Sequence, residues 1–318
     1  MLKLIYAYLL NSNGERFMGK YAPDYMELAS RDVVSRSEQT EIDEGRGVDG
    51  NVLLDVRHLG RDFIEKRLGY LQEVSLEFLG IDMAKEPVPV RPGMHYIMGG
   101  IKTDVNGLTE IPGLYAAGEC ANVSVHGANR LGANSLLDTV VFGRRSAEHA
   151  VEYIKSIGPN SKSENDLKLE QERLQSILDR PKGENIAKVR EDMAVGMTKG
   201  IGVWRDQQSI EGALENIENI KNRLPNVSVE NKGKFYNTNL IFALELEFMV
   251  DNAEAIIHGA NTRKESRGAH FRTDMPDRDD KNWLKHTLVY HDVKHENNVR
   301  IETAPVTITK WKPVERVY

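Results

Sequence analysis

The sequence predicts an α/β region followed by a helical region, and three observations support this fold class. Residues 94–150 are rich in glycine and contain short apolar runs of the kind that form buried strands. Residues 151–268 contain several amphipathic stripes with the spacing of helices. Residues 1–93 mix hairpin and helix signals. With 318 residues, the chain is long enough for two or three domains that each have a core.

The first part of the chain begins with the signal of a β-hairpin. The segments Tyr8–Leu10 and Arg16–Met18 flank Asn13-Gly14, and this dipeptide is typical of a tight primed turn. Ser30 is a residue type that favours a helix N-cap, and an apolar face begins shortly after it. Residues 63–78 also have a helical pattern. We therefore expect a mixed region of strands and helices.

The glycine-rich middle of the chain predicts strands followed by a helix. Tyr96–Ile101 and Gly113–Ala117 have the composition of buried strands in an α/β sheet. Asn106-Gly107 lies between them and predicts a tight turn. Ser135–Ala150 has apolar residues at helical spacing. The face that we expect this helix to bury consists of Leu136, Leu137, Val140, Val141 and Ala147.

Four amphipathic stripes predict a helical bundle in residues 151–268. Pro181 and Gly183 end the first stripe, and short connections between the stripes favour antiparallel packing. Their apolar side chains are expected to form the core of the bundle. Residues 269–318 have few helical signals and predict a small strand-and-loop region. The stripes run from Leu167 to Leu178, from Ile186 to Met197, from Ile210 to Ile220 and from Leu240 to Ile257.

Composition and charge exclude several function classes. A net charge of −6 gives no basis for binding nucleic acid, which requires clustered cations. The apolar stretch Leu4–Leu10 is too short to span a bilayer, and it lacks the small-residue cleavage site of a secretory signal. Cys120 is the only cysteine, so the sequence holds no cysteine set for a disulfide, zinc or an iron–sulfur cluster. A reducing compartment is therefore expected.

One glycine motif does not support a nucleotide site. Gly45–Gly50 matches the pattern G-x-G-x-x-G, which requires a strand before it and a helix after it. The residues before it have a helical pattern instead, and no clear helix start follows it. We therefore interpret the segment as a flexible loop after a helix.

The most informative segment runs from Gly113 to Asp138. It predicts a strand that ends at a glycine and at Glu119, then a glycine-rich loop, then a helix that starts near Asn134. An acid at the carboxyl end of a strand can bind sugar hydroxyls, and a helix start presents free amides to an anion. This arrangement would suit a reduced flavin. The alternative is a purely structural connection between sheet and helix.

Several ordered blocks along the chain resemble the succinate dehydrogenase/fumarate reductase flavoproteins. Val125–Arg144 resembles the second flavin-binding element of that family, and Met94–Ile101 resembles its substrate-and-flavin loop. Residues 16–36 resemble its capping domain, and residues 263–283 resemble its C-terminal region. The resemblance implies an α/β plus α fold. Its parts would be a partial capping domain (1–93), the C-terminal segment of a Rossmann-like FAD-binding domain (94–152), an antiparallel helical bundle (153–268) and a small C-terminal domain (269–318).

The same resemblance implies roles for individual residues. Arg31 matches the proton donor and acceptor at the substrate carbon, whereas by itself it would be a solvated cation at a helix start. Arginine clamps carboxylates with two parallel hydrogen bonds, which suits a dicarboxylate substrate. The residues that match groups holding the substrate carboxylates are His95 and Arg130. The residues that match flavin contacts are Glu119 at the ribose, and Ser135 and Leu136 at the isoalloxazine.

Other charged and polar residues are interpreted as structural. His126 in the glycine-rich loop is one of them, and a solitary histidine such as His95 would by itself more often be a packing residue. A run of charges near the C-terminus predicts an ion-pair network that joins the bundle to the final segment. The members of this network are Arg263, Glu265, Arg267, Asp277, Arg278 and Asp279.

The resemblance implies a flavoprotein that transfers a hydride between succinate or fumarate and FAD. Electrons would pass to an iron–sulfur subunit, and membrane anchor subunits would hold the complex at the inner face of the membrane, in the cytoplasm. The alternatives are an L-aspartate oxidase-like flavoenzyme and a catalytically silent truncated fragment that acts only in assembly. The segments Arg130–Gly143 and Arg278–Trp283 are nearer to the dehydrogenase form than to the oxidase form.

Family members also carry a long N-terminal nucleotide-binding region with the true glycine motif and a histidine that often bonds the flavin. Neither is found in this sequence, and Met1–Ala7 does not match the stretch expected before the hairpin. The resemblance begins at about Tyr8, which favours a truncated reading frame or a split gene over a decayed relative. We expect the chain alone to bind FAD weakly and to leave the segment 95–150 partly exposed.

Overall fold

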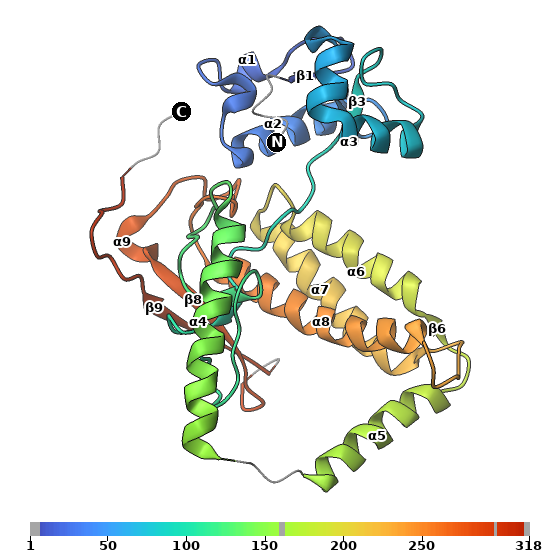
Figure 1. The fold of residues 1–318 in the computed structure, drawn as a ribbon, viewed down its shortest axis with the longest axis vertical. Helices are drawn as coiled ribbons and strands as arrows, with labels where there is room; N and C mark the ends of the chain where they lie inside the picture. Colours follow the sequence, from blue (N-terminus) through green and yellow to red (C-terminus); the bar gives the residue numbers. More distant parts are fainter. Residues whose placement is uncertain (1–6, 159–162, 296–297, 315–318) are drawn as a thin grey trace. The chain divides into compact units, whose positions relative to one another are not determined.

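The computed structural model describes residues 7–158, 163–295 and 298–314 (Figure 1). The part of the Met1–Ala7 stretch before residue 7 lies outside the described residues, as does the start of Leu4–Leu10. The described chain falls into two compact units. The first consists of the residues up to His95 together with 309–314, and the second consists of Tyr96–Ile308.

The first unit contains a small antiparallel sheet with the strand order β1-β2-β3. Leu9 of β1 lies opposite Leu54 of β2, and Leu53 of β2 lies opposite Pro89 of β3. Apolar residues at alternate positions of β2 therefore face the same side of the sheet. The elements in chain order are β1 (Tyr8–Leu10), α1 (Met18–Tyr21), η2 (Met26–Leu28), α2 (Arg31–Glu41), η3 (Ile42–Arg46), β2 (Val52–Asp55), η4 (Arg57–Leu59), α3 (Arg61–Leu79) and β3 (Val88–Val90).

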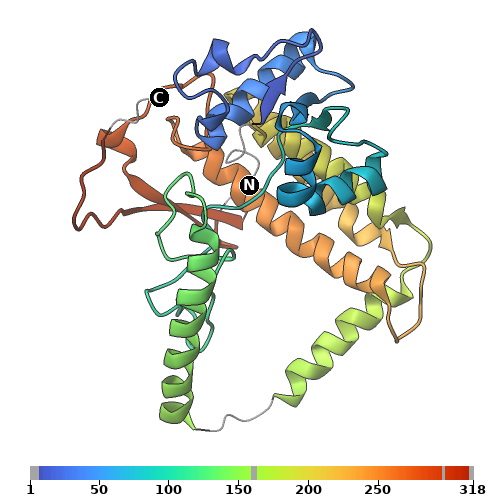
Figure 2. The ribbon, with the colours of Figure 1, turned by 45° about the horizontal axis from the view of Figure 1, so that its top comes forward.

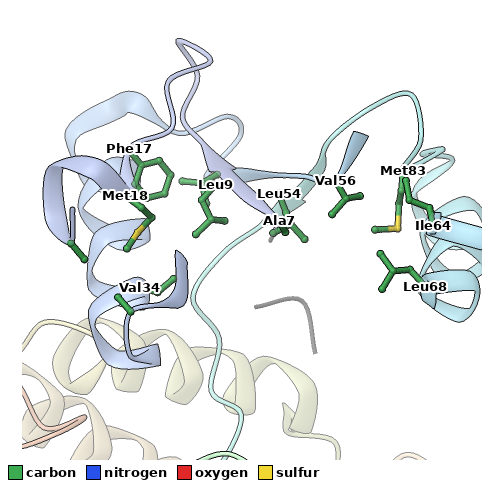
Figure 3. Close-up of a cluster of buried hydrophobic side chains, with 13 residues drawn as sticks. Ala7, Leu9, Phe17, Met18, Val34, Leu54, Val56, Ile64, Leu68 and Met83 are labelled. Atoms are coloured by element: carbon green, nitrogen blue, oxygen red, sulfur yellow. The ribbon is translucent and has the colours of Figure 1, made fainter. Parts of the chain in front are cut away.

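The sheet and the helices of the first unit share one hydrophobic core (Figure 3). Met18 of α1 is completely buried there. Ile64 and Leu68 are one helical turn apart on α3, and both side chains enter the core, which confirms the helix predicted over residues 63–78. α2 begins directly after Ser30, as the N-cap preference of serine predicts.

The hairpin predicted at the start of the chain is only partly formed. Leu10 makes a single antiparallel bridge with Arg16, so the turn between them exists. The chain then enters α1 instead of a second strand, and Phe17 and Met18 become buried in the core. The open edge of β1 pairs with β2 instead. Burial of two large side chains in tertiary contacts therefore outweighs the local hairpin signal.

The second unit contains a long isolated helix, a helical bundle and a C-terminal hairpin (Figures 1 and 2). Its elements in chain order are β4 (Ile101–Lys102), β5 (Ala121–Asn122), α4 (Asn134–Ile157), α5 (Glu164–Asp179), β6 (Glu184–Asn185), α6 (Ile186–Ile201), α7 (Gln207–Arg223), η5 (Leu224–Asn226), β7 (Val227–Ser228), α8 (Thr238–Thr262), α9 (Asp280–Trp283), β8 (Lys285–His291) and β9 (Val299–Pro305). The two views agree that α4 stands apart from the bundle helices.

The buried strands predicted in residues 96–101 and 113–117 are wrong. Among the described residues, this region forms only the short parallel pair of β4 and β5, and both residues of β4 are exposed. Tyr115 contributes no more than a single bridge to Leu108. An apolar run becomes a strand only where a partner strand accepts its hydrogen bonds, and the described chain supplies none here. The tight turn at Asn106-Gly107 is confirmed, since Gly107 has φ +73°.

α4 starts at Asn134, next to the predicted position, and continues beyond the predicted end. Its apolar face is not buried, because Leu136, Leu137 and Val140 are all exposed among the described residues. The residue of α4 that is buried is Asp138, with 3% of its surface exposed. The helix is therefore correctly predicted, whereas the face assigned to the core is wrong.

The bundle is formed mainly by α6, α7 and α8, and the stripes predicted there do form its core. Val189, Ile210, Ile217 and Leu246 are almost completely buried in that core. α6 and α7 pack closely, because a Cβ atom added at Gly200 would lie 2.3 Å from the Cβ atom of Ala213. α5 packs against α8 through a smaller buried cluster.

The end of the second unit is a two-stranded antiparallel hairpin of β8 and β9. Its register runs from Lys285 opposite Pro305 to His291 opposite Val299. This confirms the strand-and-loop region predicted after the bundle. No helix among the described residues combines the length and the apolar character needed to cross a membrane.

Candidate functional site

Two segments of the second unit meet around Tyr96 and Arg130. The guanidinium carbon of Arg130 lies 4.4 Å from the centre of the Tyr96 ring. The Oε1 atom of Glu119 accepts a hydrogen bond of 2.9 Å from the backbone N–H of Ile97. The segment before β4 therefore contacts two predicted site residues: Glu119, which lies just before β5, and Arg130, which lies in the loop after β5.

Glycine allows the close approach of these segments. Gly100 has φ +115°, and a Cβ atom at that position would lie 2.5 Å from the carbonyl oxygen of Cys120. The N–H of Ile101 donates a 2.8 Å hydrogen bond to the same carbonyl oxygen. A side chain at residue 100 would therefore push the segment that carries Tyr96 away from the strand that precedes Arg130.

The guanidinium of Arg130 is only partly satisfied by the described chain. Its Nη1 donates a 3.0 Å hydrogen bond to the carbonyl oxygen of Leu131. Its Nε is buried and has no hydrogen-bond partner among the described residues. A buried donor of a cation without an acceptor is unfavourable, and a carboxylate is the acceptor that arginine binds most strongly. The geometry of Arg130 therefore suits an anionic ligand.

Tyr96, His126 and Asp138 form a compact polar cluster beside Arg130. The Tyr96 hydroxyl lies 3.1 Å from Oδ2 of Asp138 and 3.1 Å from Nε2 of His126, and these two atoms are also 3.1 Å apart. Both donors are satisfied when the hydroxyl and Nε2–H donate to the carboxylate. Burial, followed by the hydrogen bond to Asp138, raises the pKa of Tyr96 to about 12. The phenol therefore remains a donor at neutral pH.

The loop that carries Arg130 is also fixed from the C-terminal side. The backbone N–H of Ala269 donates a 2.9 Å hydrogen bond to the carbonyl oxygen of Ala128. Gly268 has φ +61°, and a Cβ atom there would lie 2.3 Å from that same oxygen. On the other side of the loop, Ser124 Oγ lies 3.0 Å from Nε2 of His286. Backbone contacts therefore hold this loop against the segment that follows α8.

The predicted ion-pair network near the C-terminus exists, but its acidic members differ from those predicted. Glu265 is almost completely buried and pairs with Arg263 and with Arg267, whose Nε lies 2.7 Å from it. Arg267 and Arg278 then share Asp280, at 2.7 and 3.0 Å. Asp280 takes the place predicted for Asp277 and Asp279. Asp279 instead caps α9 by accepting the N–H of Asn282 at 3.0 Å, which holds its carboxylate at the helix start.

The other predicted site residues lie at exposed or half-buried positions. Arg31 is the first residue of α2 and is exposed, and His95 is exposed at the end of the first unit. Ser135 and Leu136 lie in the first turn of α4, where 70% of Leu136 is exposed. Ala133, at the N-cap position, has φ +67° and gives this helix start no side-chain hydrogen bond.

Two residues beside Arg130 were not predicted as functional. Tyr96 lies inside the segment 94–101, and Asp138 lies inside the segment 125–144, but neither was given a role. His126 was interpreted as structural, and its side chain is 10% exposed. An acid following two leucines at the start of an amphipathic helix is the one sequence signal for Asp138.

The structure also shows the surroundings of the metal-ligating residue types and of the Gly45–Gly50 motif. Within residues 7–158, 163–295 and 298–314, no group of three or more histidine, cysteine or acidic side chains could hold a metal ion. The Gly45–Gly50 segment begins at the end of η3, which follows α2, and it precedes the strand β2. This order of elements is opposite to that of a dinucleotide fingerprint, as predicted.

Comparisons with known proteins agree on one family. The model described as "FAD binding domain" matches residues 7–136, and the model described as "Fumarate reductase flavoprotein C-term" matches residues 190–318. A fumarate reductase flavoprotein subunit of Mycobacterium tuberculosis is 42% identical over an aligned length of 331 residues. The match covers 98% of this chain and 56% of that protein. The chain belongs to the succinate dehydrogenase/fumarate reductase flavoprotein family.

Further family members give the same result. A succinate dehydrogenase flavoprotein subunit of Rickettsia bellii is 42% identical over 98% of this chain and 55% of its own length. A solved structure of a mutant Escherichia coli quinol fumarate reductase matches with a TM-score of 0.93 and 37% identity, over 100% of this chain and 57% of that one. The chain thus spans somewhat more than half the length of these relatives, and its mixed α/β fold is that of their flavoprotein chains.

Proposed function

We propose that this chain provides the substrate-binding and flavin-edge part of a succinate dehydrogenase/fumarate reductase flavoprotein. The observation that carries the proposal is the guanidinium of Arg130, whose Nε is buried without a partner among the described residues. A carboxylate of succinate or fumarate would satisfy this donor. Arg130 and the predicted ligand His95 together would give the two cationic or polar contacts that a dicarboxylate needs.

FAD is the cofactor of the proposed reaction, and the first turn of α4 fits it. No side chain caps that turn, and the backbone N–H groups of Asn134 and Leu136 donate to the carbonyl oxygens of Leu131 and Ala133. What the turn offers an anion is therefore the positive end of the helix dipole, with the exposed Leu136 beside it. Ser135 and Leu136 would contact the isoalloxazine, and Glu119 would bind the ribose of the flavin nucleotide. When bound, FAD supplies the ring that exchanges a hydride with the dicarboxylate.

The protein side chains would prepare the dicarboxylate for this exchange. The positive charge of Arg130 draws electron density from a bound fumarate carboxylate, so the distal carbon becomes a better hydride acceptor. Arg31 would deliver a proton to the neighbouring carbon, and it would take this proton back in the direction of succinate oxidation. One hydride and one proton together convert the double bond of fumarate into the single bond of succinate.

We also propose the wider assembly that this function requires. The four predicted parts, 1–93, 94–152, 153–268 and 269–318, would be the partial capping domain, the FAD-binding segment, the bundle and the C-terminal domain. Because the sequence has one cysteine, an iron–sulfur partner subunit would have to supply the clusters that accept electrons. Membrane anchor subunits would hold the complex at the inner face of the membrane, in the cytoplasm.

Reconstitution tests the proposed function. The chain is expressed alone and together with the N-terminal region of the Mycobacterium tuberculosis relative, and both samples are supplied with FAD. We expect flavin to be retained, and succinate to reduce an artificial electron acceptor, only in the combined sample. Retention of flavin without any reaction with succinate or fumarate would contradict the proposal. The chain alone, supplied with the same FAD, is the matched control for flavin that is carried over without being bound.

Arg31→Ala tests the proposed proton donor in the same system. Removal of the guanidinium should abolish turnover and leave the bound flavin unchanged, because Arg31 is not among the proposed flavin contacts. Arg67→Ala, a change on another helix of the first unit, provides the matched control. Loss of flavin in Arg31→Ala, or turnover equal to that of Arg67→Ala, would contradict the role given to Arg31.

A further inference from the structure

We propose that Tyr96 is a positioning residue for Arg130, and that Asp138 and His126 hold the Tyr96 ring in place. The inference rests on the proposed function in one respect, because Arg130 is the residue proposed to bind a substrate carboxylate. It assigns a role to three side chains that lie beside that residue and do not themselves have to contact the substrate. All four residues belong to the second unit.

The aromatic ring of Tyr96 contacts the guanidinium of Arg130. The guanidinium carbon of Arg130 lies 4.4 Å from the centre of the Tyr96 ring. A guanidinium over an aromatic face is attracted by the ring electrons, and the attraction is stronger where water is excluded. Water is excluded from the Nε of Arg130, which is buried. The ring therefore supports the face of the guanidinium and leaves its edge free for a carboxylate.

Asp138 and His126 hold the Tyr96 ring in place through its hydroxyl group. The Tyr96 hydroxyl lies 3.1 Å from both Asp138 Oδ2 and His126 Nε2. The rings of Tyr96 and His126 also pack edge to face, with centroids 5.4 Å apart. The side chains of Asp138 and His126 are only 2% and 10% exposed, so the hydrogen bonds are shielded from water. The hydroxyl is thus fixed at one end of the ring while the ring face meets Arg130.

Asp138 and His126 lie on parts of the chain that differ in rigidity. Asp138 is in the second turn of α4, and α4 is a long helix, so the carboxylate has a rigid support. His126 and Arg130 belong to the irregular loop before that helix. An arginine in a loop would otherwise lose rotational freedom on binding a ligand, which costs free energy. The cluster reduces this loss by ordering the side chain in advance.

A resonance of Arg130 tests the ring contact without requiring any enzyme activity. The full chain is labelled with ¹⁵N-arginine, and the Nε–H signal of Arg130 is assigned by its loss in Arg130→Lys. We expect an upfield proton shift from the ring face, which disappears in Tyr96→Leu and is partly kept in Tyr96→Phe. Tyr70→Leu is the matched control, since Tyr70 is 77% exposed on α3. A signal that does not move in Tyr96→Leu would overturn the proposal.

Kinetics of the reconstituted flavoprotein test the consequence for substrate binding. Tyr96→Leu should raise the KM for succinate about tenfold, as expected from the loss of a desolvated cation–π contact, with flavin content unchanged. Tyr96→Phe and Asp138→Asn, which keep the ring but weaken its anchor, should raise KM less. A merely structural role would lower flavin content or kcat and leave KM unchanged, and that outcome would overturn the proposal. Absence of turnover in the wild type would instead contradict the proposed function, and the Arg130 resonance would still decide the ring contact.

Discussion

At the residue scale, the buried carboxylates of Glu41 and Glu265 are fully paired, whereas Arg130 Nε and Asp138 Oδ1, both beside Tyr96, are buried without a partner among the described residues. Glu41 is 1% exposed and accepts hydrogen bonds from Arg46 at 2.7 Å, from Tyr21 at 2.6 Å and from Asn11 at 3.1 Å. Glu265 is paired with two arginines. Buried ions that keep their charge need such partners. The unpaired Nε of Arg130 is therefore the feature of a binding residue more than of a structural one.

The glutamate at position 41 gives a pH prediction for the first unit. The hydrogen bond from Arg46, followed by those from Tyr21 and Asn11, lowers the pKa of Glu41 from 4.5 to about 2. Its stabilising contribution is therefore complete above the unfolded pKa and is lost as the pH falls from 4.5 towards 2. Hydrogen exchange of the β1 and α2 amides over this range should show the loss.

Two substitutions separate this effect from general acid unfolding. Glu41→Gln should destabilise these amides at neutral pH by about 1–3 kcal/mol, and it should also flatten their dependence on pH. Glu65→Gln is the matched control, because the Glu65 side chain is 59% exposed in its pair with Arg61. An unchanged pH dependence in Glu41→Gln would contradict the assignment.

Some individual residues could be predicted from the sequence and others could not. Arg130 and Glu119 lie in a recognisable glycine-rich block, so their importance is visible locally. The partnership of Asn11 with Glu41 joins residues that are far apart in the chain, and no local pattern reports it. The same limit applies to Tyr96 and Asp138, because a hydrogen bond across the fold leaves no periodic signal in the sequence.

At the scale of elements, helices were predicted well and short strands were not. The stripes of α6, α7 and α8 are local patterns, and each predicted helix is found close to its expected position. The segments 96–101 and 113–117 needed neighbouring strands to become a buried sheet. For α4 the pattern predicts the helix but not its surroundings, because periodicity cannot say whether the described chain covers the apolar face.

Gly268→Ala tests the contact between the loop after α8 and the loop that carries Arg130. Gly268 has φ +61°, and a new Cβ atom would lie 2.3 Å from the Ala128 carbonyl oxygen. We expect the substitution to destabilise the second unit by about 1–3 kcal/mol, because of backbone strain at positive φ. Displacement of the loop should in addition raise the KM of the reconstituted flavoprotein for succinate.

The matched control for this substitution is Gly158→Ala. Gly158 also has positive φ, at +69°, but a Cβ atom there would have no neighbour within 4 Å among the residues that the structure describes. Thermal unfolding should show a loss of stability in both variants, while the KM for succinate should change only in Gly268→Ala. Equal KM values in the two variants would show that the Ala128 contact does not position the loop.

At the scale of the whole molecule, the length that the chain shares with its relatives can be set beside the distribution of its hydrophobic cores. The chain spans 56% of the Mycobacterium tuberculosis relative, and the described part of residues 96–158 contributes few residues to any hydrophobic core. The bundle and the first unit have well-formed cores of their own. Family membership could be predicted from the sequence because ordered motifs identify it without reference to packing. The partial exposure expected for the segment 95–150 followed from that resemblance, and the exposed Leu136, Leu137 and Val140 agree with it.

The most direct measurement of the central claim is an anaerobic titration of the reconstituted flavoprotein with succinate, followed by the absorbance of the flavin. The account predicts that succinate bleaches the oxidised flavin in the wild type. It also predicts that Arg130→Gln, with its flavin retained, requires much higher succinate concentrations. Full flavin occupancy without bleaching by succinate, or bleaching of Arg130→Gln at wild-type concentrations, would contradict the account.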